Sequence, residues 1–572
     1  MNRLKHIFIL LLTTLAMVAC SKDDNNGMHS PGKDNGESQL YYMSVNLGMD
    51  GNGGGTRLTY DNGVEAESAV KKANARFYFY DEFGTPLAVG EFVNKEGFLK
   101  LNDASNKPGV SHESDKLIIL GPSERYPTYV LAVLNSTQNF EGKRMGEVYE
   151  AICSSAISST KGAFVMTNAS YLDTKNKFAC ALDIKGKLYT TKEDALADPV
   201  NIYVERIVAK VSMKYADKVT GTFPVDDEYL STDGTGVNSI QMRVVVDGWC
   251  LNALNTKTTY VKALDEKWAT NLPFTGWNDS FRSYWALDHN HTSNIGTSSE
   301  AFYTDSETYK ELTYRSWNEA KNGADTKTEY CYENTVDKAY QMAKPDNRTN
   351  VTTMLVAAHA EYSTDKGTSW VKDADLYSYN GTLYTTEGYK NLYLQWLQEQ
   401  GYGFYKSITD ANGSSIEWKD FTAENITFTT ESVGESFKRV RLKVTDIGVP
   451  SGYTLTQKAT DGTISSTEVT TQLIDAAVAT MNAANRTECF AGGKCYYQIP
   501  IKHLANEGET NYGVVRNHIY QLVLSGISRI GEPVYNPDKG LEYIPGEKDN
   551  YWIAARISIL KWRIVNQETD FM

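Results

Sequence analysis

Two residues near the start of this 572-residue chain have the types and neighbours that covalent processing needs. Cys20 follows an apolar leader, and its thiol is a predicted site of lipidation. Arg57 follows Gly53-Gly54-Gly55, and a glycine-rich segment is flexible and open to proteases. The bond between Arg57 and Leu58 is therefore a predicted cleavage site for an arginine-specific protease.

The leader has the parts of a secretory signal. Arg3 and Lys5 give a positive start, His6 to Val18 contains the apolar stretch, and Met17-Val18-Ala19-Cys20 resembles the lipobox of bacterial lipoproteins. The following Ser21-Lys22-Asp23-Asp24 looks like the surface-export signal of Bacteroidetes lipoproteins. Residues 1–19 are therefore predicted to be a signal peptide, and the precursor is expected at the outer membrane, held by a lipid anchor. The alternative is an ordinary secretory signal with a chance cysteine at its end.

A strand is predicted between these two sites. Its apolar side chains alternate along the sequence, which is typical of a half-buried strand. They are Tyr41, Met43, Val45, Leu47 and Met49. Because the strand lies between a lipid tether and a cleavage site, residues 20–57 are predicted to form a removable propeptide. The alternative is a permanent first strand.

A second strand is predicted at the other end of the chain. Residues 531–550 are rich in Pro and Gly, and they separate the apolar strand Trp552 to Val565 from the preceding domain. Residues 531–572 are therefore predicted to be a linker followed by a strand that is donated to a neighbouring molecule. The predicted donor residues are Ile557, Ile559, Leu560, Trp562 and Ile564. The alternative is that this strand completes its own domain.

The patterns between these ends predict a mainly β fold. Tyr occurs 37 times, and aromatic residues favour pleated, half-buried surfaces. Asn201 to Met213 is predicted to be one long strand with a bulge near Glu205-Arg206, and Tyr389 to Leu397 has the spacing of an amphipathic helix. We expect two tandem antiparallel β-sandwich-like domains with a few short helices, at residues 58–220 and 221–530.

The charge balance argues against one class of partner. The chain has 57 Lys and Arg against 71 Asp and Glu, a net charge of −14. Contacts with phosphates need clustered basic residues, so nucleic acid is not an expected partner.

The remaining cysteines leave the disulfide question open. Cys489 and Cys495 flank Ala491-Gly492-Gly493, which is predicted to turn, so they are the pair best placed for a disulfide. The alternative is that both are buried free thiols.

Catalytic motifs do not stand out in the sequence. No GxSxG, HExxH, P-loop or strand-linked GxGxxG occurs. Asp288-His289-Asn290-His291 and Asp410-Ala411-Asn412-Gly413 contain residue types that bind metals, but a solvated loop and a hairpin turn are the favoured interpretations. No enzyme activity, metal or cofactor is expected.

Several strings, taken in order, resemble the FimA/Mfa-type fimbrillins of Bacteroidales, the subunits of type V pili. The leader, its strand and Arg57 match the layout of that family. The strings within the domains are Tyr129 to Asn135 followed by Gly142 to Met145, Gly162 to Thr167, Val204 to Val211, and Gly513 to Tyr520. The resemblance covers essentially the whole chain.

The resemblance implies two transthyretin-like β-sandwich domains in a pilus stalk subunit that is exported as a surface lipoprotein. It implies that a protease cuts after Arg57 and removes the strand Tyr41 to Met49, and that the empty groove accepts the C-terminal strand of another copy. Further copies of the chain, anchor and tip subunits and the protease are the implied partners, and adhesion and biofilm formation are the implied roles. Leu58 departs from the small residues, such as Ala, that are familiar after the scissile Arg.

The competing interpretation is a binding protein. A monomeric surface lipoprotein would capture glycans with exposed aromatics such as Trp277, Trp285 and Trp317, and it would keep its lipid tether. A secreted hydrolase is the third class, because carboxylate pairs occur by chance among 71 acidic residues. The predicted removable and donated strands favour the fimbrial subunit.

Overall fold

The structure is a computed structural model, and it describes the greater part of the chain after residue 40. The described residues are 41–48, 75–87, 91–93, 112–120, 127–154, 164–172, 178–225, 230–231, 240–264, 286–289, 312–323, 328–335, 351–410, 413–433, 439–465, 467, 469–483, 487–503, 511–541, 553–560 and 565–566.

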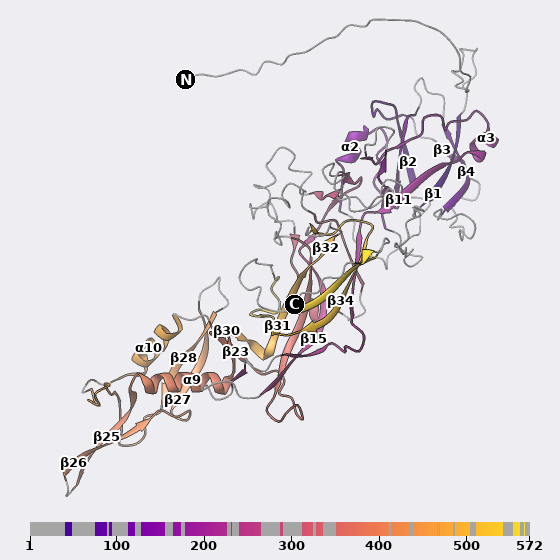
Figure 1. The fold of residues 1–572 in the computed structure, drawn as a ribbon. Helices are drawn as coiled ribbons and strands as arrows, with labels where there is room; N and C mark the ends of the chain where they lie inside the picture. Colours follow the sequence, from indigo (N-terminus) through magenta and orange to yellow (C-terminus); the bar gives the residue numbers. More distant parts are fainter. Residues whose placement is uncertain are drawn as a thin grey trace, which may run out of the picture. The chain divides into compact units, whose positions relative to one another are not determined.

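Most of the described chain is β-structure with a few short helices, as the sequence predicted (Figure 1). The N-terminal sheet has eight of the described strands. Their order is β10 (Leu182–Asp183), β5 (Tyr129–Leu134), β7 (Met166–Asn168), β11 (Val200–Arg206), β1 (Tyr41–Gly48), β4 (His112–Leu120) and β3 (Glu91–Val93), with β2 (Ala75–Tyr80) on β5.

Strands β2 and β5 are buried on both faces. Phe77 and Phe79 of β2 lie in one core cluster and Tyr78 and Tyr80 in another, because alternate side chains of a strand point to opposite faces. Strand β5 divides its residues between the same two clusters. Burial on both faces explains why the sequences of both strands are almost continuously apolar.

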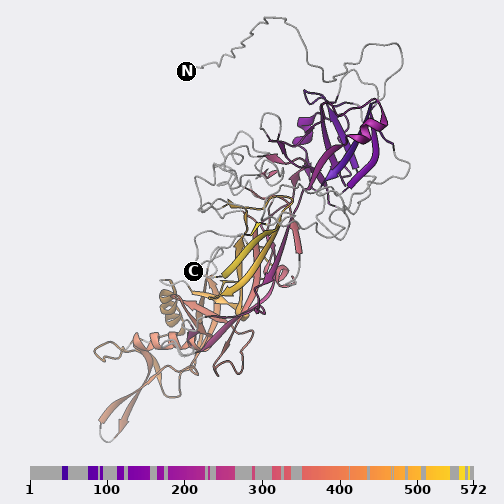
Figure 2. The same cartoon turned by 45° about the vertical axis from the view of Figure 1, so that its right-hand side comes forward.

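Two further sheets contain the long strands that Figure 2 shows in a turned view. The β34 sheet has the order β21 (Thr328–Cys331), β12 (Ala209–Tyr215), β34 (Ile519–Ile527), β36 (Ile553–Leu560) and β37 (Val565–Asn566). The long-strand sheet has the order β13 (Thr222–Val225), β15 (Gln241–Asn252), β22 (Thr353–Ser363), β31 (Lys494–Pro500) and β35 (Glu532–Pro533). One core cluster takes residues from both sheets.

A four-stranded sheet is shared between two cores. Its order is β14 (Leu230–Ser231), β24 (Thr382–Thr385), β23 (Leu376–Tyr379) and β30 (Thr487–Phe490). Leu376 and Phe490 belong to the core of the two long sheets, whereas Tyr377 and Cys489 belong to the next cluster. This second cluster also takes side chains from β25 (Tyr402–Asp410), β27 (Ile426–Val433), β28 (Arg439–Ile447) and β29 (Thr454–Gln457).

The described helices are short, and the longest was predicted. Helix α9 (Thr386–Glu399) begins at Thr385, whose hydroxyl accepts a hydrogen bond from the Gly388 amide, and it buries Tyr389, Tyr393 and Leu397 on one face. The others are α2 (Met145–Tyr149), α3 (Lys192–Ala197), α7 (Trp317–Lys321), α10 (Thr471–Ala483) and the 3-10 turn η5 (Ala491–Gly493). None of the helices in the described part of the chain is long and apolar enough to cross a membrane.

The remaining strands form hairpins and short pairs. They are β26 (Gly413–Asp420) on β25, β27 on β28, β16 (Leu254–Asn255) on β20 (Leu312–Thr313), β17 (Thr258–Thr259) on β6 (Ile152–Cys153), β18 (Ala263–Leu264) on β19 (Ala286–Leu287), β32 (Lys502–His503) on β33 (Asn511–Tyr512), and β8 (Tyr171–Leu172) on β9 (Phe178–Ala179).

One predicted strand is wrong. The segment Asn201 to Met213 is not one bulged strand, because β11 ends at Arg206 in the N-terminal sheet and β12 begins at Ala209 in the β34 sheet. Ile207 and Val208, both buried, carry the chain from one sheet to the other. The change of phase in the sequence marks this crossing. The predicted domain boundary near residue 220 stays a prediction.

Candidate functional site

Strand β1 occupies the interior of the N-terminal sheet. It pairs with β11 in parallel, with Val45 opposite Val200, and with β4 in antiparallel, with Met43 opposite Ile118. Four of the five residues predicted for the removable strand, Tyr41, Met43, Val45 and Leu47, lie in β1, and Met49 lies outside the described residues. An interior strand fills the backbone hydrogen-bonding capacity of two neighbours, so its loss would leave two unpaired edges.

Met43 anchors β1 in the core. Its side chain is fully buried in a cluster with Phe77 and Phe79 of β2 and with Val200 and Ile202 of β11. Met side chains fill irregular gaps well, and burial of one contributes about 1.5–3 kcal/mol. Removal of β1 would therefore leave an apolar hollow between two strand edges.

The predicted processing residues lie outside the described residues. These are Cys20, Arg57 and Leu58. Arg76, the other arginine near the propeptide, lies in β2, where its backbone pairs with Val133 and its guanidinium Nη1 donates to the Ser136 carbonyl at 2.8 Å. This pairing protects the Arg76 bond from a protease.

The C-terminal strand lies in the sheet of its own chain. Strand β36 pairs in antiparallel with β34, so that Ile557 faces Leu522, Ile559 faces Tyr520 and Leu560 faces Ile519. Trp562 and Ile564 lie outside the described residues. In this structure the strand completes its own domain, which is the alternative arrangement that the sequence allowed, and its donation to another copy stays a prediction.

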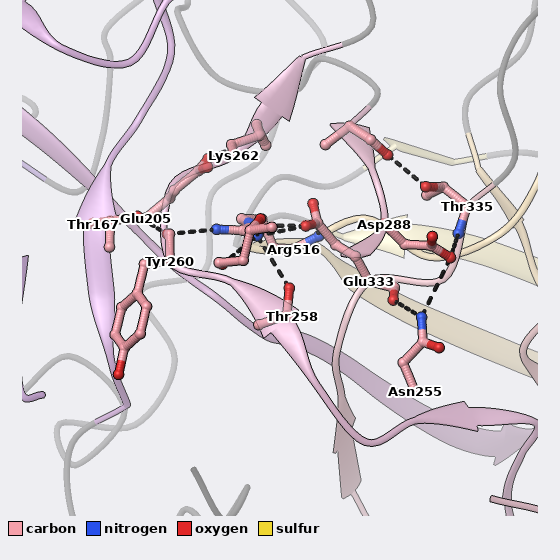
Figure 3. Close-up of polar contacts among 12 residues, drawn as sticks. Thr167, Glu205, Asn255, Thr258, Tyr260, Lys262, Asp288, Glu333, Thr335 and Arg516 are labelled. Carbon is pink, nitrogen blue, oxygen red and sulfur yellow. Dashed lines mark hydrogen bonds and ion pairs between the residues drawn. The ribbon is translucent and has the colours of Figure 1, made fainter. Parts of the chain in front are cut away.

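A buried polar network lies beside the crossing from β11 to β12 (Figure 3). Glu205, near the end of β11, accepts a hydrogen bond from Lys262 Nζ at 3.0 Å, and both side chains are fully buried. Burial raises the pKa of Glu205, and the charges of Lys262 and Arg516 oppose this rise. The loss of one partner of such a pair leaves an uncompensated buried charge.

Arg516 is the centre of the second part of this network. Its Nε and Nη2 both donate to Glu333 Oε2, at 2.8 and 2.6 Å, and its Nη1 donates to the Tyr260 carbonyl at 3.0 Å. The Thr259 carbonyl accepts a further bond from Nη2 at 2.9 Å. A guanidinium with this many acceptors is satisfied without water, and it fixes the segment that leads into β34.

Asn517 joins the same segment to β11. Its side-chain oxygen accepts hydrogen bonds from the backbone amide and the Nη1 of Arg206, at 3.3 and 3.2 Å. Direct hydrogen bonds thus join β11, the strand beside β1, to the segment that leads into β34, the strand beside β36. The network positions strands, and it places no activated nucleophile beside a base.

Sequence reasoning missed the pairs Glu205–Lys262 and Glu333–Arg516. Their members are 57 and 183 residues apart, so no local pattern joins them. A signal was present, since Glu205 and Arg516 are charged residues in otherwise apolar buried segments, and buried charges are normally paired.

The predicted disulfide is not formed. Cys489 and Cys495 are both buried free thiols, and they lie in different core clusters, Cys489 with Tyr377 and Cys495 with Tyr497. The turn between them, at η5, separates strands of two different sheets and does not bring the thiols together. Burial raises the pKa of each thiol to about 12, which makes both unreactive near neutral pH.

Of the aromatic residues proposed for glycan capture, the one that the structure describes is buried. Trp317 is only 2% exposed, and its indole Nε1 donates to the Cys495 carbonyl at 2.9 Å, so it belongs to the core. Trp277 and Trp285 lie outside the described residues, as does His291. Among the residues that the structure describes, no group of His, Cys, Asp and Glu is arranged to hold a metal ion.

Comparison with known proteins gives one family match. Residues 488–568 match the family described as major fimbrial subunit protein type IV, fimbrillin, C-terminal. No curated protein matches the chain. The matched residues include β31 of the long-strand sheet and β34 and β36 of the sheet beside it in the same core.

Solved structures of fimbrial proteins are similar to the chain only distantly. The fimbrilin FimA from Porphyromonas gingivalis W83 has 11% identity and a TM-score of 0.30, with 92% of this chain and 99% of that one covered. The tip fimbrial protein Mfa3 from Porphyromonas gingivalis has 10% identity and a TM-score of 0.31, with 91% and 100% covered. A fimbrial assembly protein from Parabacteroides distasonis has 10% identity and a TM-score of 0.25, with 67% and 97% covered.

These TM-scores are too low to support an argument, so the assignment depends on the family match. That match covers the late strands of the chain and includes the string Gly513 to Tyr520. Residues 488–568 are thus similar to the C-terminal region of the fimbrillin family of major fimbrial subunits.

Proposed function

We propose that this protein is a structural subunit, of the stalk kind, in a cell-surface fimbria, and that its copies join by strand exchange. Its precursor is lipidated at Cys20 and held at the outer membrane, and an arginine-specific protease cuts after Arg57. The cut releases β1, and the C-terminal strand of another copy, within residues 552–572, takes its place. The family match in residues 488–568 supports a fimbrial role.

The observation that carries the proposal is the interior position of β1. An edge strand could be lost at the cost of one row of hydrogen bonds, but β1 pairs with β11 on one side and β4 on the other. An incoming strand would satisfy both edges through its main chain and fill the hollow around Met43 with a side chain. Four or five buried apolar side chains would contribute on the order of 10 kcal/mol before ordering costs.

The position of the C-terminal strand is compatible with a donor role. Strand β36 follows the Pro- and Gly-rich residues 531–550, which the sequence predicted to be a linker, but residues 531–541 pack in the body of the protein with Val534 and Leu541 buried. Strand β36 pairs in antiparallel with β34 on one edge and with β37 on the other. A strand that leaves its own sheet and enters the next molecule makes a head-to-tail contact that does not close on itself. Such a contact propagates into a filament. Anchor and tip subunits would begin and end it, and the filament would support adhesion and biofilm formation.

The test is cleavage of the purified precursor by an arginine-specific protease, followed by N-terminal sequencing and native mass spectrometry. The proposal predicts a new N-terminus at Leu58 and a ladder of multimers. The R57K variant keeps the charge but removes the cleavage site, and it should stay monomeric.

A truncated chain that ends at residue 552 separates the two strand roles. It keeps an acceptor slot but has no donor strand, so it should shorten the filaments of the intact chain when the two are mixed. A chain that ends at residue 566 keeps β36 and β37 and is the matched control. A cleaved chain that stays monomeric, or truncated chains that leave filament length unchanged, would overturn the proposal.

A further inference from the structure

Strands β25 and β26 form a hairpin whose outer strand has one free edge (Figure 1). Their sheet has the order β26, β25 and β29, so β26 pairs with β25 alone among the described strands. Strand β26 is eight residues long and contains no proline. The edge strands of the long-strand sheet, by contrast, carry Pro224 and Pro533, and those of the β34 sheet have four residues and two. A long edge strand without proline is a template for pairing with another chain.

The register shows which residues of β26 face this edge. The Lys458 amide donates to the Gly401 carbonyl at 2.8 Å, so the odd-numbered residues of β25 direct their backbone groups toward β29 and the even-numbered ones toward β26. Even-numbered residues of β25 lie opposite odd-numbered residues of β26, as Lys406 lies opposite Glu417. The residues whose N–H and C=O groups point to the free edge are therefore Ser414, Ile416 and Trp418.

The side chain of Trp418 orders this edge. Its ring lies against Gly403 of β25, where a Cβ would approach the ring Cζ2 to 2.4 Å. Its Nε1 donates to Asp420 Oδ1 at 2.7 Å, and Lys458 Nζ lies 4.4 Å from the ring centroid. The neighbouring Ile416 is 59% exposed, although it lies on the same strand face as Trp418. Because the edge is ordered before a partner binds, pairing costs less conformational entropy.

The other face of β26 carries opposite charges two residues apart. Glu417 and Lys419 share this face, and Glu417 forms no ion pair with any described residue, although Lys406 lies opposite it on β25. Lys406 and Lys419 both extend over Tyr453, with their Nζ atoms 5.7 and 4.3 Å from the ring centroid. The carboxylate and the two amines are therefore available to charges on a partner.

We infer that β26 is a lateral docking edge for a second copy of this chain, which pairs with it in antiparallel about a two-fold axis at Trp418. In this register Glu417 of each copy faces Lys419 of the other, so the charges are complementary. On the opposite face, Ile416 of each copy lies diagonal to Trp418 of the other, and their apolar surfaces meet. An axis at Glu417 would oppose two carboxylates, and an axis at Ile416 would leave Glu417 and Lys419 without charged partners.

The size of the edge determines where such pairs accumulate. Two edges of eight residues are too small for the roughly 1,200 Å² that a stable complex buries, so the uncleaved chain should stay monomeric in dilute solution. A filament repeats the edge in every subunit, and many weak pairs along two filaments add up through multivalency. This part of the inference rests on the proposed function, and it predicts filaments that associate side by side.

The first experiment detects the pair without a filament. The E417C and K419C variants of the uncleavable R57K chain are mixed and oxidised at high concentration, and the products are read by peptide mass spectrometry. A disulfide between position 417 of one copy and position 419 of the other is expected in the mixture, because residues in such a pair are close enough to be bridged. A mixture of E417C with S415C is the matched control, since these positions face each other only when the axis lies at Ile416.

The second experiment reverses charges in the cleaved chain. The E417K variant places lysines opposite each other, and it should weaken side-by-side association of filaments about tenfold, measured by light scattering and electron microscopy. The E417K/K419E variant has opposite charges across the edge again and should restore the association. The E424K variant, changed at an exposed carboxylate outside β26, is the matched control and should associate normally.

The outcomes separate the inference from the proposed function. A mixture that forms no disulfide between positions 417 and 419 would overturn the pairing, whether or not filaments form. A disulfide between positions 417 and 415 in its place would overturn the register. Filaments that associate equally well from the unaltered chain and from E417K would overturn the lateral role. A chain that forms the expected disulfide but no filaments after cleavage would overturn the proposed function and leave the pairing of β26 in place.

Discussion

At the scale of single residues, this protein depends on a few charged side chains that are fully buried. Glu205 and Lys262 have no exposed side-chain surface, and neither do Glu333 and Arg516. Desolvation makes such pairs costly, so their contribution to net stability is small when both partners are present. Their effect is on specificity, because any other arrangement of these strands would leave the same charges unpaired.

The first prediction concerns the pair Glu205–Lys262. The K262M variant should lower the free energy of unfolding by about 3–5 kcal/mol, because Glu205 then remains buried without its partner. The double variant K262M/E205L should recover much of that loss. Urea unfolding followed by circular dichroism measures both.

A surface pair provides the control for this prediction. Lys143 and Glu147 are about half exposed and form an ion pair within one helical turn. The K143M variant should change the free energy of unfolding by less than about 1 kcal/mol. If K262M cost no more than K143M, the buried network would not have the importance that we give it.

The second prediction concerns the pH dependence of stability around His359. Its Nδ1 lies 2.9 Å from the Asp247 carboxylate, at the bulge of β15, and its Nε2 lies 3.3 Å from Glu361. The hydrogen bond to Asp247 raises the pKa of His359 above its usual 6.5, although burial opposes the rise. Arg243 and Lys372 also bind Glu361, so the group contains cations as well as carboxylates.

A raised pKa in the folded state means that folding stabilises the protonated imidazole. The stabilisation should be fully present below pH 6.5, and it should be lost as the pH rises through the folded-state pKa. The urea midpoint of the unaltered chain, measured between about pH 5 and 9, should therefore decrease as the pH rises. The H359Q variant should flatten this part of the profile, and equal profiles for the two chains would contradict the assignment.

At the scale of elements, much of the fold could be predicted from sequence because local patterns specify strands and helices. The alternation in Tyr41 to Met49 marked β1, and the spacing from Tyr389 to Leu397 marked α9. The crossing between β11 and β12 could not be predicted, because the alternation of a strand does not reveal which sheet it joins. The pairing of β36 with β34 is equally invisible, since one apolar strand can complete its own sheet or that of a neighbour.

At the scale of the whole molecule, the core clusters share strands and are not independent. Ile519 of β34 lies in the core with Tyr78, and the next residue, Tyr520, lies in the core of the two long sheets. The four-stranded sheet that contains β23 joins that core to the one around α9 in the same way, because Leu376 lies in the first core and Tyr377 in the second. A strand that serves two cores cannot leave one without exposing the other.

The third prediction follows from these shared strands. Cys180, Cys495 and Cys489 each lie in a different one of these three cores, and all are buried free thiols. Labelling of the three thiols should show the same urea midpoint, because the cores should unfold together. Alkylation with iodoacetamide at increasing urea, read by peptide mass spectrometry, measures each midpoint. Three separated midpoints would mean that the cores unfold one by one.

The crossing at Ile207 and Val208 has a mechanical consequence. In a filament joined through the β1 slot, a pull from the neighbour would enter the subunit along β11 and β4, in the direction of the strands. Only two residues separate β11 from β12, so the load would pass directly into the sheet that contains β34. The bonds from Arg206 to Asn517 and from Lys262 to Glu205 hold the end of β11 where the load turns from one sheet to the next. Tension along the filament would then shear many hydrogen bonds at once, and it would not peel them one after another.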